Sequence, residues 1–164
     1  MNKDIILLIG MPGCGKSTIG ELLAKEINYD FCDMDKYIEA REGKSIKDIF
    51  ILGEDIFRDI ESEACMELNN RKRTVIASGG GIVKRKENIE AFKGKAIIIY
   101  IDRPIENINK DINITNRPLL KDGKEKLYNI YKERSHLYNN FCNYKVINYK
   151  SINNVLDEII NTIA

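Results

Sequence analysis

The sequence predicts an α/β domain in which helices cover both faces of a parallel sheet. Short apolar runs alternate along the chain with longer stretches whose apolar residues recur every three or four positions. Strands that are apolar throughout are buried on both faces, which is typical of parallel sheets. The 164 residues, 43% of them hydrophobic, fit one domain with a full core, spanning residues 1–164.

Five apolar runs have the length of strands. In order along the chain they are "DIILLIG" (4–10), "YDFCD" (29–33), "TVIAS" (74–78), "KAIIIYI" (95–101) and "YKVINY" (144–149). Their spacing leaves room for a helix between most successive strands, as crossover connections of a parallel sheet require.

Helices are predicted where apolar residues fall on one face. Such faces occur in Lys16–Ile27, Glu54–Asn69 and "SINNVLDEIINTI" (151–163). Ser45 with Asp48 three residues later resembles a capping box that opens a further short helix.

One polar stretch, Asn113 to Lys126, shows little periodicity. Pro118 breaks it and Gly123 loosens it, so the stretch is predicted to be a mobile loop. The part of it that would act as a lid spans about residues 112–124.

The composition excludes several classes of protein. Lys and Arg total 26 against 25 Asp and Glu, so no net field favours nucleic acid or an anionic membrane as a partner. No apolar run has the length of a membrane span or a signal peptide. Four dispersed cysteines and one histidine argue against a zinc site or a disulfide framework. We expect a soluble, monomeric, cytoplasmic protein.

The segment "GMPGCGKST" (10–18) matches the phosphate-binding pattern G-x-x-x-x-G-K-[ST] between a predicted strand and a predicted helix. Its glycines let backbone N–H groups turn toward phosphate oxygens, and the helix N-terminus favours negative charge. Lys16 is expected on the β- and γ-phosphates and Ser17 on Mg²⁺, while Cys14 is interpreted as a small filler. The residues predicted to bind the nucleotide here are Gly10, Gly13, Cys14, Gly15, Lys16, Ser17 and Thr18.

A phosphate-binding loop alone does not distinguish a kinase, a nucleotide hydrolase and a switch. The guanine-specific pattern N-K-x-D is approached only by "NKDI" (109–112), whose acid comes one position early. A motor is usually larger than this chain. The length therefore favours a kinase that acts on a small molecule.

Two aspartates are candidates for the acid that holds the metal. Asp33 and Asp102 each end a predicted strand, where open α/β sheets bind ligands, and the pattern alone does not separate them. Asp35 favours Asp33, because one acid of a pair can serve Mg²⁺ while its neighbour accepts a substrate hydroxyl. The alternative for Asp35 is an N-cap of the helix through Tyr37 and Ile38.

Glycine and arginine residues complete the predicted acceptor side. The triplet in "SGGG" (78–81) indicates close approach of backbone to a ligand. Arg58 and Arg134 are either solvated rim residues or planar forks for a carboxylate. Arg117, in the predicted loop, is interpreted as a lid residue that closes over the phosphates and excludes water.

Six motifs in order resemble the shikimate kinase family along nearly the whole chain. They are "GMPGCGKST", "DMD" (33–35), "GEDIFRDIE" (53–61), "SGGG", "RPLL" (117–120) and "ERSHLY" (133–138). The resemblance implies a three-layer α/β/α P-loop kinase fold with a five-stranded parallel sheet and a mobile lid. It also implies phosphorylation of shikimate by ATP to 3-phosphoshikimate, a step of chorismate and aromatic amino acid biosynthesis.

The resemblance also implies roles for individual residues. Lys16, Asp35 and Arg117 are expected to be catalytic, with Mg²⁺ on Ser17 and Asp33. Shikimate would contact Asp35, Arg58, Gly79, Gly80, Gly81 and Arg134. The nucleotide would contact Arg117, Lys110 and Lys150 besides the loop, and Asp102 becomes peripheral.

The chain departs from the family pattern at several points. Lys110 stands where an arginine often lies against adenine, and "KSI" (150–152) replaces a loop that often contains proline. Two residues separate Phe50 from Gly53 where three are common, and Ser135–His136 lacks a usual proline. The alternatives kept open are a gluconate kinase or nucleoside-monophosphate kinase, and a nucleotide-binding module without catalysis.

Overall fold

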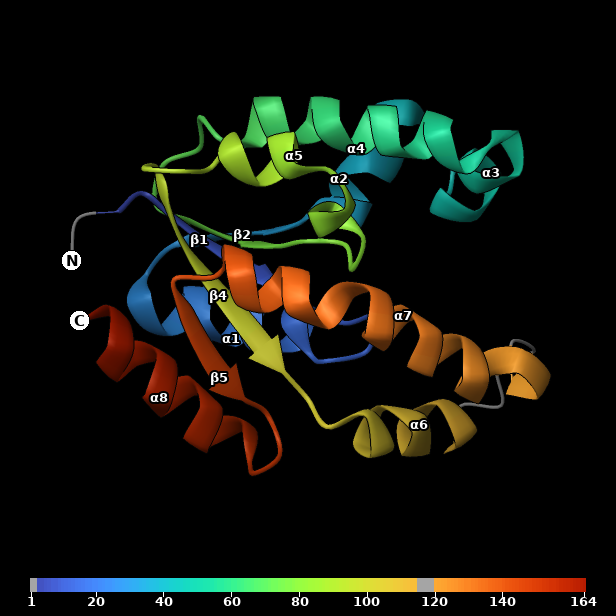
Figure 1. Cartoon of the computed structure of the whole chain (residues 1–164). Helices are drawn as coiled ribbons and strands as arrows, with labels where there is room; N and C mark the ends of the chain where they lie inside the picture. The colour runs from blue at the N-terminus through green and yellow to red at the C-terminus, as the bar shows by residue number, and fades with distance from the viewer. Residues whose placement is uncertain (1–2, 115–119) are drawn as a thin grey trace.

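A parallel sheet of five strands in the order β2-β3-β1-β4-β5 forms the centre of the molecule (Figure 1). The computed structural model describes residues 3–114 and 120–164. The strands are β1 (Ile5–Ile9), β2 (Asp30–Asp33), β3 (Thr74–Ala77), β4 (Ala96–Asp102) and β5 (Tyr144–Ile147). All four ladders are parallel, so the predicted strands and their direction are confirmed.

Helices flank this sheet on both sides (Figure 1). They are α1 (Lys16–Ile27), α2 (Met34–Glu42), α3 (Ile46–Leu52), α4 (Glu54–Leu68), α5 (Lys86–Glu90), α6 (Ile105–Ile114), α7 (Leu120–Phe141) and α8 (Ile152–Ile163), with a 3₁₀ turn η1 (Ile82–Lys84). Figure 1 shows α1 and α8 on one side of the sheet and α4 and α5 on the other. The predicted three-layer fold is therefore confirmed.

The core lies on both faces of β1, whose five residues are all 0% exposed. Gly20 of α1 lies against Leu8 and Phe31, where a β-carbon would come within 2.8 Å of the Phe31 ring. On β4, the ring of Tyr100 stacks on Tyr138 of α7 at 5.2 Å. Within the described residues, no helix combines the length and the apolar character that a membrane span requires.

Two local expectations differ from the structure. The loop predicted over Asn113–Lys126 is helical wherever it is described, because α6 continues to Ile114 and α7 begins at Leu120 and runs through Gly123. Packing of the long α7 outweighs the low helix propensity of that glycine. Arg117 lies outside the described residues.

The second difference concerns the cap of α2. Asp33, not Asp35, is its N-cap: the backbone of Asp33 is extended, and its side chain accepts the N–H of Lys36 at 3.2 Å. Asp35 lies inside the first turn, so the capping alternative for Asp35 is wrong. Ser45 caps α3 as expected, since its Oγ accepts the N–H of Asp48 at 3.1 Å, which is one of the two hydrogen bonds of a capping box.

Candidate active site

The phosphate-binding loop joins β1 to α1 at the carboxyl edge of the sheet. Gly13 and Gly15 have φ of 79° and 101°, in the left-handed region that favours glycine. The ammonium group of Lys16 donates to the carbonyl oxygens of Gly10 at 2.7 Å and Met11 at 2.9 Å. Cys14 is fully buried, and its sulfur lies 3.6 Å from the Lys16 Nζ. The backbone carbonyl groups of the loop thus stabilise the positive charge of Lys16.

Two side chains outside the motif hold the loop. Asn148 donates to the carbonyl of Cys14 at 2.9 Å, and Arg103 donates to the carbonyl of Gly13 at 3.0 Å. Arg103 also pairs with Asp111 of α6 at 2.6 Å. These residues were missed by the sequence analysis, because their partners are backbone atoms distant in the chain and no short pattern connects them.

A cavity of about 310 Å³ lies beside the loop on the α6 side. Its lining includes Gly15, Thr18, Arg103 and Lys150. Lys110 does not line it and lies on the exposed side of α6. Of the two lysines predicted to contact the nucleotide outside the loop, only Lys150 therefore borders this cavity.

Ser17 and Asp33 meet at the end of β2. The Ser17 hydroxyl donates to Oδ2 of Asp33 at 2.7 Å, and Oδ1 of the same carboxylate caps α2. A hydroxyl and a carboxylate beside a phosphate-binding loop are hard oxygen ligands of the kind that Mg²⁺ takes together with substrate phosphates and water. The donor set therefore fits Mg²⁺.

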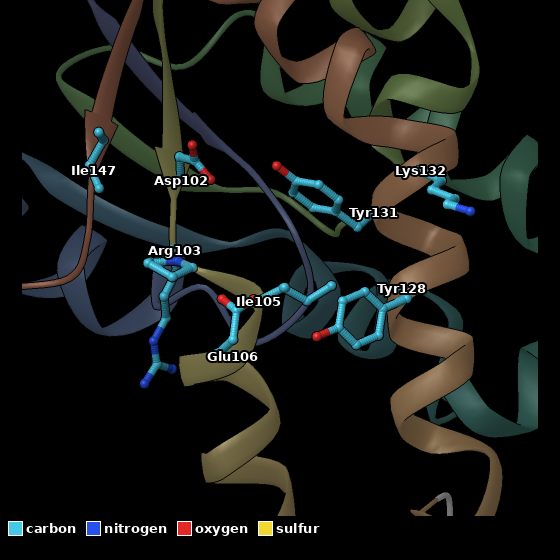
Figure 2. Close-up of a pocket in the computed structure, with 9 residues that line it drawn as sticks. Asp102, Arg103, Ile105, Glu106, Tyr128, Tyr131, Lys132 and Ile147 are labelled. Atoms are coloured by element: carbon cyan, nitrogen blue, oxygen red, sulfur yellow. The ribbon is translucent and has the colours of Figure 1, made fainter.

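Asp102, the competing candidate, is engaged elsewhere. Its carboxylate pairs with Lys145 of β5 at 3.1 Å and accepts the Tyr100 hydroxyl at 3.3 Å. Figure 2 shows Asp102 at the end of β4 on a separate cavity, which Tyr128 and Tyr131 of α7 border from the other side. Asp102 lines neither the acceptor pocket nor the cavity beside the loop.

A pocket of about 380 Å³ brings the predicted acceptor residues together. We call it the acceptor pocket; the described residues that line it are Pro12, Asp35, Ile46, Phe50, Glu54, Phe57, Arg58, Glu61, Gly79, Gly80, Gly81, Lys84, Lys126, Ile130 and Arg134. Every substrate residue expected from the sequence lies in this set. Pro12 belongs to the phosphate-binding loop, so the pocket borders the place where ATP phosphates would lie.

Asp35 and Glu61 are the two more buried of the three acids among the described residues that line the pocket. Burial raises the pKa of Asp35, and the negative charge of Asp33 adds to the effect. Burial likewise raises the pKa of Glu61, whose residue is 1% exposed, although Arg58 opposes the shift. Glu61 was missed by the sequence analysis, because a glutamate beside an apolar stripe is usually solvated.

Arg58 is held between acids and aromatic rings. Its Nη1 donates to Glu61 at 2.9 Å, and its guanidinium lies 5.0 Å from the centre of the Phe57 ring. Arg58 and Arg134 are each 8% exposed. Among the described residues, the Nε atoms of both arginines are buried without a hydrogen-bond partner. Buried N–H groups without a partner are rare in folded proteins, so these two atoms are candidates for binding an acceptor group of a ligand.

Because the glycine triplet has no side chains, it leaves space for the side chains of Arg58 and Asp35. A β-carbon on Gly81 would lie 2.2 Å from Nη1 of Arg58, and one on Gly79 would lie 3.0 Å from Oδ1 of Asp35. Gly80 lies against Pro12, and its carbonyl accepts the Tyr138 hydroxyl. The triplet thus lies close to the side chains of Asp35, Pro12 and Arg58, and its approach to a ligand stays a prediction.

The family model described as shikimate kinase matches residues 12–164. A shikimate kinase of Clostridium botulinum (strain Alaska E43 / Type E3) is 52% identical over 157 residues, which cover 96% of this chain and 95% of the relative.

Two solved structures have a fold similar to that of this chain. Shikimate kinase from Acinetobacter baumannii in complex with shikimate superimposes with a TM-score of 0.91 at 32% identity, covering 99% of this chain and 93% of the other. A gluconokinase from Sinorhizobium meliloti reaches a TM-score of 0.65 at 15% identity, covering 97% and 90% of the two chains. The second likeness extends to the fold alone.

Proposed function

This chain belongs to the shikimate kinase family, and on that premise we propose that it phosphorylates shikimate with ATP at the acceptor pocket. The product is 3-phosphoshikimate, an intermediate of aromatic amino acid biosynthesis. The observation that carries the proposal is the convergence of Asp35, Arg58 and Arg134 on one pocket that Pro12 connects to the phosphate-binding loop.

The charge of the pocket supports an acceptor with one carboxylate. Its described lining holds three acids (Asp35, Glu54, Glu61) and four bases (Arg58, Lys84, Lys126, Arg134), which leaves one positive charge in excess. A nucleotide acceptor would bring at least two negative charges. A neutral sugar would provide no carboxylate for the Nε atoms of Arg58 and Arg134, which have no hydrogen-bond partner among the described residues.

Asp35 is proposed to receive the hydroxyl of shikimate. Transfer forms a bond between that oxygen and the γ-phosphorus, breaks the bond from the γ-phosphorus to the β,γ-bridging oxygen, and releases the hydroxyl proton to an Asp35 oxygen. A carboxyl with a raised pKa holds that proton better than an ordinary aspartate does. Asp35 thereby orients the nucleophile and accepts its proton.

Lys16 and Arg117 are proposed to stabilise negative charge on the phosphates. Lys16 would exchange its bonds to Gly10 and Met11 for phosphate oxygens. Arg117, outside the described residues, retains its proposed role as the lid arginine. Lys110 and Lys150 remain proposals for the nucleotide, of which Lys150 has the support of the cavity.

Magnesium is proposed to bind Ser17 and Asp33. When bound, it would neutralise charge on the β- and γ-phosphates. Ser17 and Asp33 already lie within hydrogen-bond distance of each other, so their oxygens would need only a small separation to accept the ion. We further propose that the protein acts as a cytoplasmic monomer. Nucleic acid and anionic membranes are not proposed as partners, because the balanced charge provides no field that would attract them.

The experiment is an assay of ADP release by the purified protein with ATP and Mg²⁺. Shikimate should be required, and gluconate, AMP and CMP should not replace it. ADP release that is independent of shikimate would contradict the proposal. Arg58→Lys serves as the test of the pocket: it should raise the shikimate KM, because a point charge cannot replace the planar fork.

A further inference from the structure

One carboxylate oxygen at the mouth of the acceptor pocket is shared between two cations. Oε1 of Glu54 accepts a hydrogen bond from Lys84 Nζ at 2.8 Å. The same oxygen lies 3.5 Å from both Nε and Nη2 of Arg58. Glu54 and Arg58 are one turn apart on α4, while Lys84 ends η1, so the contact with Lys84 is the one made across elements.

Within the part of the chain that the structure describes, the guanidinium group of Arg58 has one edge that is not occupied by a strong hydrogen bond. Nη1 of Arg58 is taken by Glu61 at 2.9 Å, whereas Nε has no hydrogen-bond partner among the described residues. The edge formed by Nε and Nη2 is the one that can hold a planar carboxylate with two parallel bonds. Glu54 faces this edge, but at a distance too long for a strong bond.

We propose that Lys84 is a positioning residue for shikimate: it holds Glu54 away from the Nε/Nη2 edge of Arg58 and so keeps that edge open for the acceptor carboxylate. The inference deepens the proposed function and rests on it. Lys84 itself has no need to contact the substrate.

Without Lys84, Glu54 would be free to close on Arg58. The two residues are spaced i, i+4 on one helix, a spacing at which Glu and Arg pair readily. The hydrogen bond from Lys84 is the main cause that lowers the pKa of Glu54, but the charge of Arg58 lowers it as well. Glu54 therefore remains ionised near neutral pH in either arrangement and would compete with the substrate for the same edge.

Among the residues that the structure describes, Lys84 has one further acidic neighbour. Glu133 of α7 lies 3.7 Å from its ammonium group, which is beyond a normal hydrogen bond. The side chain of Lys84 is 28% exposed and that of Glu54 is 50% exposed. Replacing either residue consequently removes no core packing, and the variants are expected to fold.

The experiment measures steady-state kinetics of four variants. Lys84→Met should raise the shikimate KM by roughly two- to fivefold, the range that a half-exposed ion pair supports, with kcat and the ATP KM unchanged. Lys84→Arg keeps a donor for Glu54 and should restore the KM. The double variant Lys84→Met/Glu54→Gln should also return the KM toward wild type, because the competitor is gone.

Lys86→Met is the matched control. Lys86 is two residues from Lys84, pairs with Glu90 at 3.5 Å and does not line the acceptor pocket. Its loss removes the same charge and should leave the shikimate KM unchanged.

Two results would overturn the inference. If Glu54→Gln fails to rescue Lys84→Met, Lys84 acts on the substrate directly; if Lys84→Met has the wild-type KM, Lys84 plays no part. Calorimetric titration of the wild-type protein with shikimate distinguishes these two results from a failure of the proposed function. If the proposed function is wrong, the wild-type protein should not bind shikimate.

Discussion

The hydroxyl of Ser17 donates a 2.7 Å hydrogen bond to Oδ2 of Asp33, while Oδ1 of the same carboxylate caps α2. One aspartate thus connects the phosphate-binding loop to the helix that carries Asp35. Its two oxygens have separable duties, since one faces the proposed metal site and the other stabilises a helix.

These duties predict different effects for two substitutions of Asp33. Asparagine is a good N-cap but a weaker metal ligand, so Asp33→Asn should raise the Mg²⁺ requirement with little change in stability. Asp33→Ala loses the cap as well and should lower the free energy of unfolding by about 1 kcal/mol. Titration of activity with Mg²⁺ and urea denaturation measure the two effects. Equal stability of both variants would contradict the capping role.

Asp35→Asn should lower kcat by roughly 10²-fold or more, as loss of a general base does, and should leave ATP binding intact. In the wild-type protein, the activity should fall as the pH falls through the raised pKa of Asp35, above the ordinary value of 3.8. The pH profile of kcat and calorimetry with ATP provide the measurements. Near-normal turnover of Asp35→Asn would contradict the base role.

The same pKa shift predicts an opposite effect on stability. The folded-state pKa of Asp35 lies above the unfolded value, so the folded state binds more protons in between and stability falls as pH rises through this window. Asp35→Asn removes a buried charge and should therefore raise the melting temperature near pH 7. Below the unfolded pKa, where the carboxyl is protonated in both states, the gain should disappear. A melting temperature that stays at the wild-type value near pH 7 would contradict the shift.

Glu61 should matter for both stability and substrate binding. Its side chain and that of Arg58 are 1% and 9% exposed, so Glu61→Ala leaves a buried cation without its partner. The expected loss is about 3 kcal/mol in the free energy of unfolding, together with a higher shikimate KM. Glu63→Ala is the control on the same helix, because Glu63 is 61% exposed and its pair with Arg41 should contribute little. An unchanged KM in a folded Glu61→Ala protein would show that Glu61 does not position Arg58.

Gly81→Ala separates positioning from folding. Gly81 has an ordinary backbone conformation, with φ of −92°, but an added β-carbon would lie 2.2 Å from the Arg58 guanidinium. The end of a long side chain can move and keep its bond to Glu61, so the melting temperature should fall less than in Glu61→Ala, while the shikimate KM rises by roughly tenfold, about one displaced charged hydrogen bond. In Gly80→Ala the β-carbon meets the Pro12 ring at 2.7 Å, and stability should fall as well. A wild-type KM in Gly81→Ala would contradict the role of the triplet.

The parallel sheet and the phosphate-binding loop could be predicted because both depend on local patterns. β1 is apolar at every position, and its structure shows the burial that this implies. Asp33 and Asp35 could be placed near the site because parallel strands end at one edge of a sheet. Which of them caps α2 depends on the backbone angle at Asp33, which the sequence does not reveal.

Residues that act through distant partners could not be predicted. Glu61 is an ordinary helix glutamate until α4 packs. Its signals in the sequence were its spacing of three residues from Arg58 and its place at the end of the motif "GEDIFRDIE", and neither assigns it a role. Asn148 reaches the carbonyl of Cys14 across 134 residues of chain. The helix through Gly123 could not be predicted, because the low helix propensity of glycine is a local property, whereas α7 is stabilised along its length by contacts such as that of Tyr138 with Tyr100.

The hydrogen bonds from Lys16 to Gly10 and Met11 make phosphate binding an exchange of partners. When the ammonium group swings to a phosphate, it leaves two carbonyl oxygens that it had neutralised, so the affinity for ATP reflects a difference between two sets of bonds. Replacement of Lys16 by a neutral residue should therefore weaken ATP binding in two ways. The variant would lack the cation, and it would also present two bare acceptors in a loop that must attract an anion.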